Sequence, residues 1–217
     1  MSKRGKTRKP ISEKTKLLLD SLSRRTGVRN VARRILIVCE DDKSSPNYFR
    51  AIIQKYRLSA AAVVVGSGHQ TQPIQVVDLA IERRERAKES TQETPFDETW
   101  CVIDGEYGKK IANARARANA KNIKLAISTP CFEYWVLLHF KQTSNAGPDC
   151  KAVMRSLFEH IPDYEKGKCD FENVVQHVKD ASQYAHLCRK QGLAAHPHPE
   201  DQNPCSELFK LIKSLNL

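Results

Sequence analysis

Two acidic residues each stand directly after a mostly apolar run, in a pattern that could bring their carboxylates together. Glu40 follows the run 35–39 (ILIVC), and Asp104 follows the run 99–103 (TWCVI), with Glu106 two residues further on. Ligands of open parallel sheets bind beyond the carboxyl ends of the strands, so such acids would face the functional edge of a sheet. Carboxylates gathered there repel one another and either take up a proton or bind a cation, for which Mg²⁺ is well suited. The alternative from the pattern alone is that the acids cap the next helix or lie in a solvated, glycine-containing turn.

The elements that would position these acids alternate between strand and helix from residue 34 onward. Continuous apolar runs predict buried strands at 35–39, 61–65, 99–103 and 124–127. Helical spacing of apolar residues predicts helices at 46–56, 73–88, 109–119 and 131–140. This alternation predicts an α/β fold in which helices cover both faces of a parallel sheet.

The pattern changes near residue 145, and this change divides the predicted architecture. Helices are predicted at 149–160, 170–191 and 205–215. We therefore expect an α/β core at 34–145 and a helical C-terminal extension at 146–217. Residues 1–33 precede the first strand and are expected to form a basic arm that is disordered or partly helical, with an amphipathic stretch at 13–25.

Positive charge is concentrated in this N-terminal arm. Residues 1–34 hold 12 Lys or Arg against two acids, which is +10 of the formal net charge of +11. One interpretation is a solvated arm that keeps the protein soluble, another is an arm that binds nucleic-acid phosphates, and a third is an arm that meets an acidic protein surface. The candidate nucleic-acid contacts are Arg24, Arg25, Arg29, Arg33, Arg34 and, in the first predicted turn, Lys43.

Composition excludes several classes of protein. No apolar run approaches the roughly 20 residues needed to span a bilayer. The N-terminus is basic and polar and lacks the apolar segment of a signal peptide, so we expect a cytoplasmic protein without membrane association. Seven cysteines are scattered without a CxxC pair, which argues against a zinc site and against a disulfide framework.

Some conspicuous side chains are better explained as structural. His139, Trp100 and Trp135 lie in apolar runs and are expected to be core residues, the histidine with a hydrogen-bond partner. His196 and His198 flank a proline in a polar loop, where solvated imidazoles are the usual state. The turn Gly66–Ser67–Gly68 could hold a phosphate through backbone N–H groups, although glycine-rich turns are common.

Four segments, taken in order, resemble the RloB family. Residues 34–50 (RILIVCEDDKSSPNYFR) resemble its opening strand and turn, and residues 99–104 (TWCVID) resemble its second block. Residues 127–140 (ISTPCFEYWVLLHF) resemble its third block, which is the most specific of the set. Residues 203–212 (NPCSELFKLI) are similar to its closing segment, so the resemblance covers roughly residues 34–217.

The resemblance implies a Toprim-like fold and a metal-dependent site. A Toprim domain places a Glu at the end of its first strand and an Asp-x-Asp pair at the end of a later one. By that match Glu40 would be the general acid or base, and Asp104 and Glu106 would bind Mg²⁺ or Mn²⁺. Glu40 is itself a candidate metal ligand as well, and Asp42 and Glu133 are further candidates. The activity implied is nuclease cleavage of DNA or RNA in prokaryotic phage defence, with nucleic acid and a partner ATPase as partners.

Two departures from the family pattern leave a second function open. Glu106 stands where the pair has its second Asp, which lengthens the side chain by one methylene. Asp41 stands where the family turn has a glycine, and Asp adopts positive φ less freely. The alternative is a catalytically inactive nucleic-acid-binding or regulatory subunit on the same scaffold. A third possibility is an RNA-binding protein that uses the basic arm alone.

Overall fold

The computed structural model describes residues 33–217 except 60–62, 68–71, 109 and 145–146. The candidate contacts Arg24, Arg25 and Arg29 and the amphipathic stretch at 13–25 lie outside the described residues. Arg33–Leu217 is one compact unit. No helix in the part of the chain that the structure describes is long and apolar enough to cross a membrane.

A five-stranded sheet with the order β2-β1-β3-β4-β5 forms the centre of this unit. Its strands are β1 (Ile35–Cys39), β2 (Val63–Ser67), β3 (Glu98–Asp104), β4 (Lys124–Thr129) and β5 (Cys205–Ser206). The first four strands are parallel, and β5 pairs antiparallel with the end of β4. The predicted α/β class with a mainly parallel sheet is confirmed.

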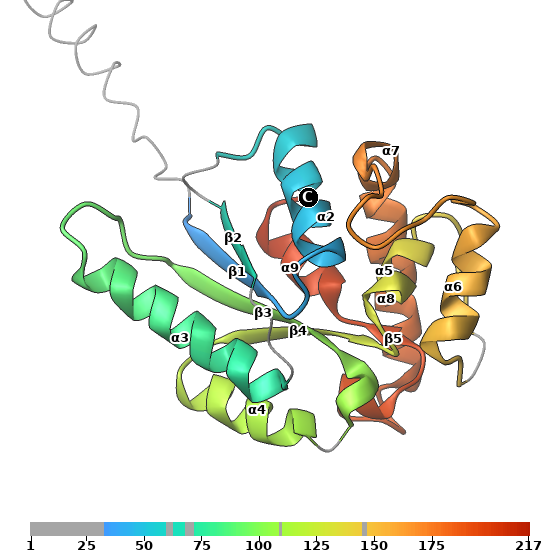
Figure 1. Ribbon diagram of the computed structural model, residues 1–217. Coiled ribbons are helices and arrows are strands. Elements are labelled where there is room, and N and C mark those ends of the chain that lie inside the picture. Colours follow the sequence, from blue (N-terminus) through green and yellow to red (C-terminus); the bar gives the residue numbers. More distant parts are fainter. Residues whose placement is uncertain (1–32, 60–62, 68–71, 109, 145–146) are drawn as a thin grey trace, which may run out of the picture. The chain divides into compact units, whose positions relative to one another are not determined.

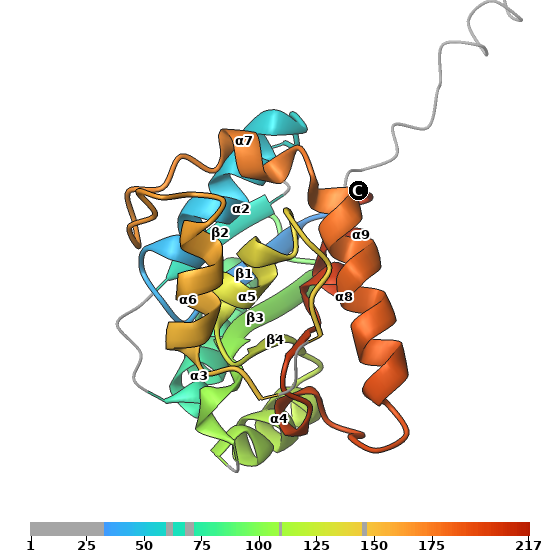
Figure 2. The same cartoon turned by 90° about the vertical axis from the view of Figure 1, so that its right-hand side faces the viewer.

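Helices cover both faces of the sheet, because successive strand side chains point to opposite sides. In β1, Ile35 and Ile37 belong to one buried cluster, whereas Leu36 and Val38 belong to the other. The second of these faces is covered by α3 (Pro73–Glu89) and α4 (Lys110–Ala120) (Figure 1). The first face is covered by α2 (Ser44–Lys55), α5 (Phe132–Leu137), α6 (Cys150–Phe158), α7 (Glu172–Val175), α8 (Val178–Gly192) and α9 (Leu208–Ser214) (Figure 2). The helical C-terminal extension therefore shares one hydrophobic core with the sheet.

The second strand ends later than expected, and the first two residues of its predicted range, 61–62, lie outside the described residues. Val63 pairs with Ile35 and Ser67 pairs with Cys39, so β2 runs to Ser67 in order to match the full length of β1. The turn predicted to begin at Gly66 therefore does not begin there, since Gly66 and Ser67 are inside the strand and pair with Val38 and Cys39, while residues 68–71 lie outside the described residues.

Two of the predicted C-terminal helices also differ. The single helix expected at 170–191 is divided into α7 and α8. Val174, Val175 and Val178 are all buried, so the apolar pattern continues through the break and does not reveal it. The helix expected from residue 205 begins only at Leu208, because Cys205 and Ser206 pair with β4.

The structure confirms that His139 and the two tryptophans are core residues. His139 is 4% exposed, and its ring nitrogens lie 3.0 Å from the Tyr48 hydroxyl and 3.0 Å from the Trp135 carbonyl. Burial lowers the pKa of His139 to about 4, so the imidazole is neutral near pH 7. Trp100 and Trp135 are 4% and 0% exposed.

Candidate active site

Glu40 and Asp104 meet at the carboxyl edge of neighbouring strands. The backbone N–H of Glu40 donates to the Val102 carbonyl (3.0 Å), which continues the β1–β3 pairing by one residue. The Glu40 Oε2 atom then accepts a hydrogen bond from the Asp104 backbone N–H at 3.0 Å. The strand-end pattern in the sequence therefore places both side chains at one edge of the sheet, as expected.

Asp104 joins this edge to the start of α5. Its Oδ1 atom accepts the Phe132 backbone N–H at 2.9 Å, in the first turn of that helix. The next residue, Glu133, is 1% exposed. Burial raises the pKa of Asp104 well above its usual range, and the charges of Glu133 and Glu40 raise it further. Glu40, Asp104 and Glu133 therefore form one group of mutually repelling carboxylates, called the acidic cluster below.

Glu133 is held by two residues from the segment between α6 and α7. Its Oε1 atom accepts from the Tyr164 hydroxyl (3.2 Å) and lies 3.1 Å from the Lys166 ammonium. Its Oε2 atom is buried and has no hydrogen-bond partner among the described residues. Burial lowers the pKa of Lys166, but the charges of Glu133 and Asp104 outweigh this and raise it overall. Lys166 therefore acts as a cation for the acidic cluster.

Glu40 is positioned by a second tyrosine. The Tyr107 hydroxyl donates a hydrogen bond to the Glu40 carboxylate, which lowers the pKa of Glu40. Burial is the larger influence, and the charges of Glu106 and Asp41 add to it, so the pKa of Glu40 is raised overall. A carboxyl group with a raised pKa, partly buried and held at a fixed position, is suited to general acid–base chemistry.

Glu106 and Asp41 occupy different surroundings from the acidic cluster. Glu106 is exposed on the short 3₁₀ helix η1 (Gly105–Tyr107), where its Oε2 atom accepts from the Cys150 thiol at 3.8 Å. Asp41 accepts the backbone N–H groups of Lys43 (2.8 Å) and Ser45 (3.2 Å) and thereby caps the start of α2. Asp41 does not have a positive φ, so the turn forms without the glycine of the family pattern.

The remaining predicted nucleic-acid contacts, Arg33, Arg34 and Lys43, lie beyond opposite ends of β1. Lys43 is exposed and, like Asp42, lies in the turn at the carboxyl edge. Arg33 and Arg34 precede β1, so the five-residue strand, about 17 Å long, separates them from that edge. Arg33 forms an ion pair with Glu98, and the Arg34 guanidinium lies 4.3 Å from the centre of the Phe96 ring. Their role in binding nucleic acid stays a prediction.

The acidic cluster fits a divalent cation in its chemistry but is not a ready-made metal cage. Within residues 33–217, outside the gaps given above, no three His, Cys, Asp or Glu side chains are grouped so that they could hold a metal ion. Mg²⁺ requires fewer protein ligands, because it usually keeps several waters and takes one or two carboxylates. The buried Glu133 Oε2 without a partner and the raised pKa of Asp104 are both features that a bound cation would relieve.

We expect the E40Q variant to be more stable than the wild type at about pH 8 and equally stable near pH 4. Burial raises the pKa of Glu40 above its usual 4.5. At pH values between the usual pKa and the raised pKa, the folded state therefore binds more protons than the unfolded state. Stability from this group is therefore lost as the pH rises through that window. Gln keeps an acceptor for the Asp104 N–H.

Thermal unfolding of both proteins across this pH range measures the difference. The buried His139 titrates in both, so its opposite contribution cancels in the comparison. A difference in melting temperature that does not change with pH would contradict a raised pKa for Glu40.

Comparison with known proteins gives one match. A family model described as RloB-like protein matches residues 35–215, which include the whole sheet, both strand-end acids and nearly all of the C-terminal extension. No curated protein and no solved structure matches the chain.

Proposed function

The chain belongs to the RloB-like protein family, and from this membership and the acidic cluster we propose that it is a Mg²⁺- or Mn²⁺-dependent nuclease of prokaryotic phage defence. Its reaction would be phosphodiester cleavage in DNA or RNA in the cytoplasm, on a Toprim-like scaffold and together with a partner ATPase. The observation that carries the proposal is the convergence of Glu40, Asp104 and Glu133 at the carboxyl edge of the sheet.

Each residue of the cluster has a proposed role that follows from its contacts. Asp104 and Glu133 would hold the cation, since Glu133 is buried, Asp104 is partly buried, and the charge of Glu133 raises the cost of ionising Asp104. A bound Mg²⁺ would polarise the phosphate and stabilise the leaving oxygen. Glu40, with its raised pKa and the Tyr107 hydrogen bond, would transfer the proton. Lys43 would contact a substrate phosphate from the same edge.

A specific observation keeps the second function in view. Glu106, which stands in place of the second Asp of the family pair, is exposed and contacts Cys150. A scaffold that lacks this ligand could bind nucleic acid or regulate a partner without cleaving. The alternative is therefore a catalytically inactive nucleic-acid-binding or regulatory subunit.

Cleavage assays separate these two functions. The full chain, alone and with an ATPase encoded beside it, would be incubated with tRNA, single-stranded RNA and plasmid DNA in Mg²⁺, Mn²⁺ or EDTA. The proposal requires cleavage that depends on the metal and is lost in the D104N variant. Equal cleavage by both proteins would indicate contamination, and retained binding without cleavage in every condition would favour the inactive subunit.

We expect the K166M variant to gain more thermal stability from Mn²⁺ than the wild type does. Removal of Lys166 leaves the buried Glu133 without its cation, and a divalent ion then neutralises the cluster without competition. The metal-free variant is expected to lose about 1–2 kcal/mol of stability, since Lys166 is itself half exposed.

Unfolding curves with and without Mn²⁺ measure this directly and need no enzymatic activity. K168M is the matched control, because Lys168 lies on the same segment and pairs only with the exposed Glu165 among the described contacts. Equal metal-induced shifts in K166M, K168M and the wild type would show that the cation does not bind beside Glu133.

A further inference from the structure

A cavity of about 910 Å³ lies beside β4, away from the acidic cluster. Residues of α4 and β4 line one side of it, and residues of the α8 and α9 region line another. We call this cavity the β4-edge pocket. Asp104 lies opposite Ser128 in the sheet, four residues or about 13 Å along β4 from Lys124, which lines the pocket. Its volume is near the upper end of the roughly 300–1,000 Å³ typical of ligand sites.

Cations outnumber acids around this pocket. Its lining includes five basic side chains and one acid: Arg115, Lys124, Arg189, Lys190, Lys210 and Glu207. Four of the cations contact three acids: Lys124 is 3.1 Å from Glu98, Arg115 contacts Glu200, and both Lys210 and Arg189 (3.7 Å) contact Glu207. Five cations against these three acids leave a surplus of two positive charges. The contacts orient the cations and leave the pocket attractive to an anion.

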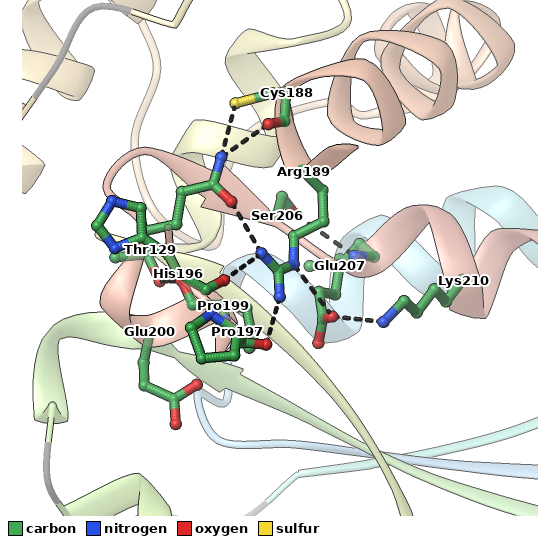
Figure 3. A network of polar contacts seen from close by, with 12 residues as sticks. Thr129, Cys188, Arg189, His196, Pro197, Pro199, Glu200, Ser206, Glu207 and Lys210 are labelled. Atoms are coloured by element: carbon green, nitrogen blue, oxygen red, sulfur yellow. Dashed lines mark hydrogen bonds and ion pairs between the residues drawn. The ribbon is translucent and has the colours of Figure 1, made fainter. Parts of the chain in front are cut away.

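One wall of the pocket is fixed by a buried arginine (Figure 3). The Arg189 guanidinium donates to the carbonyls of His196 (2.7 Å) and Pro197 (2.6 Å) and to the side-chain oxygen of Gln202 (3.0 Å). Gln202 in turn donates to the Cys188 carbonyl at 2.7 Å. Arg189 thereby ties the segment after α8 to the helix itself, so the wall is formed before any ligand binds.

Aromatic rings lie among the cations. His186 is exposed and meets Phe209 edge to face with ring centroids 5.2 Å apart, and both line the pocket. The buried ring of Trp100 also borders the pocket, with its centroid 5.1 Å from the Lys124 ammonium, and of these three rings it is the one too buried to stack on a base. Interleaved aromatic and basic side chains are the combination with which proteins hold single-stranded nucleic acid, through stacked bases and paired phosphates.

The pocket is also linked to the point where the basic N-terminal sequence joins the sheet. Glu98 contacts both Lys124 of the pocket and Arg33, the first described residue. The sequence before Arg33 carries ten Lys or Arg against two acids. A basic pocket on a chain that carries this additional positive charge favours a polyanion over a neutral ligand.

The free edge of β4 is too short to favour an added peptide strand. β5 already pairs with Ser128 and Thr129, and the Ile127 carbonyl accepts the Glu207 N–H at 2.8 Å. Recognition here must come from side chains, and those side chains are cationic and aromatic.

We propose that the β4-edge pocket binds a single-stranded segment of nucleic acid, with its phosphates on Lys190, Lys210 and Lys124 and its bases against Phe209 and His186. This inference deepens the proposed nuclease function and rests on nucleic acid being the substrate. The pocket would hold the strand at a distance from the acidic cluster, and its residues would not take part in cleavage.

Binding in EDTA tests this separately from cleavage. Fluorescence anisotropy with labelled single-stranded RNA and DNA of about 12 nucleotides would compare the full-length wild type with K190E/K210E. The matched control is K151E/K179E, which makes the same charge change at exposed lysines of α6 and α8 outside the pocket. We expect affinity to fall about tenfold or more in K190E/K210E only, with a salt slope smaller by roughly 1.4 for two lost phosphate contacts.

Photocrosslinking locates the bound oligonucleotide on the protein, and competition with other polyanions identifies the class of ligand. Crosslinks from a photoreactive oligonucleotide are expected on peptides that contain His186 and Phe209. Equal losses in both double variants, or crosslinks confined to other peptides, would overturn the proposal. Binding that poly-L-glutamate displaces as well as an unlabelled oligonucleotide would assign the pocket to an acidic protein instead. Loss of cleavage in D104N with oligonucleotide binding unchanged would leave the pocket proposal intact, so the two proposals fail separately.

Discussion

Exchange of Asp104 for Asn is expected to lower metal-dependent cleavage by about 10³-fold, because a cation ligand supplies several kcal/mol of charge stabilisation in the transition state. Asn keeps the Oδ1 acceptor for the Phe132 N–H, so the start of α5 stays in place. What the variant removes is the negative charge that faces Glu133 and Glu40. Initial cleavage rates at saturating Mg²⁺ measure the effect.

The same exchange is expected to stabilise the metal-free protein by about 0.5–2 kcal/mol, since functional sites commonly hold groups in unfavourable surroundings. Burial and two neighbouring carboxylates raise the pKa of Asp104, so its ionisation near pH 7 opposes folding. D163N is the matched control, because Asp163 is exposed. Loss of activity together with loss of stability in D104N would mean that Asp104 is a structural cap and not a metal ligand.

If D104N lowers cleavage and raises stability, this would also explain why the acidic cluster places carboxylates where they destabilise the folded protein. The buried Oε2 atom of Glu133, which has no hydrogen-bond partner among the described residues, costs folding free energy. Tyr164 and Lys166 reduce that cost at the other oxygen, Oε1. The arrangement is what a site requires if a cation is to enter it.

Part of this site could be predicted from residue order because it depends on local pattern. Glu40 and Asp104 end apolar runs, and parallel pairing of neighbouring strands brings such positions to one edge. Gly105 follows for a steric reason, since a side chain there would collide with Thr129. Glu133 is predicted as a metal ligand mainly from the family resemblance. Without it, an acid at the start of a helix is more simply explained as a favourable charge for the helix dipole.

Other parts could not be predicted because they depend on long-range packing. Lys166 and Tyr164 lie in a polar segment with no periodicity, and only the packing of α6 and α7 against the sheet brings them to Glu133. The exposure of Glu106 could not be predicted either. Its spacing from Asp104 matches the family pair, but the η1 turn directs its side chain to solvent. Spacing along a chain predicts a ligand pair only where the backbone keeps a regular conformation.

The R189M variant is expected to lower the free energy of unfolding by about 3 kcal/mol, or roughly 6–12 °C in melting temperature for a chain of this size. Arg189 is 6% exposed, and its guanidinium holds two backbone carbonyls and the Gln202 side chain while it lies 3.7 Å from Glu207 (Figure 3). Methionine fills similar space but donates no hydrogen bond, so Gln202 and Glu207 lose a partner at buried positions. The value is at the lower end for a buried ion pair because Lys210 still contacts Glu207.

The adjacent K190M variant is the control, because Lys190 is exposed on the same helix and its replacement should change stability by no more than about 0.5 kcal/mol. R189K should lose most of the same stability, since an ammonium cannot reach in several directions as the planar guanidinium does. Urea unfolding of the three variants and the wild type measures these differences. If R189K were as stable as the wild type, positive charge alone would hold the segment after α8. If R189M were as stable, the wall of the β4-edge pocket would be held by packing, and the Arg189 hydrogen bonds would contribute nothing measurable to it.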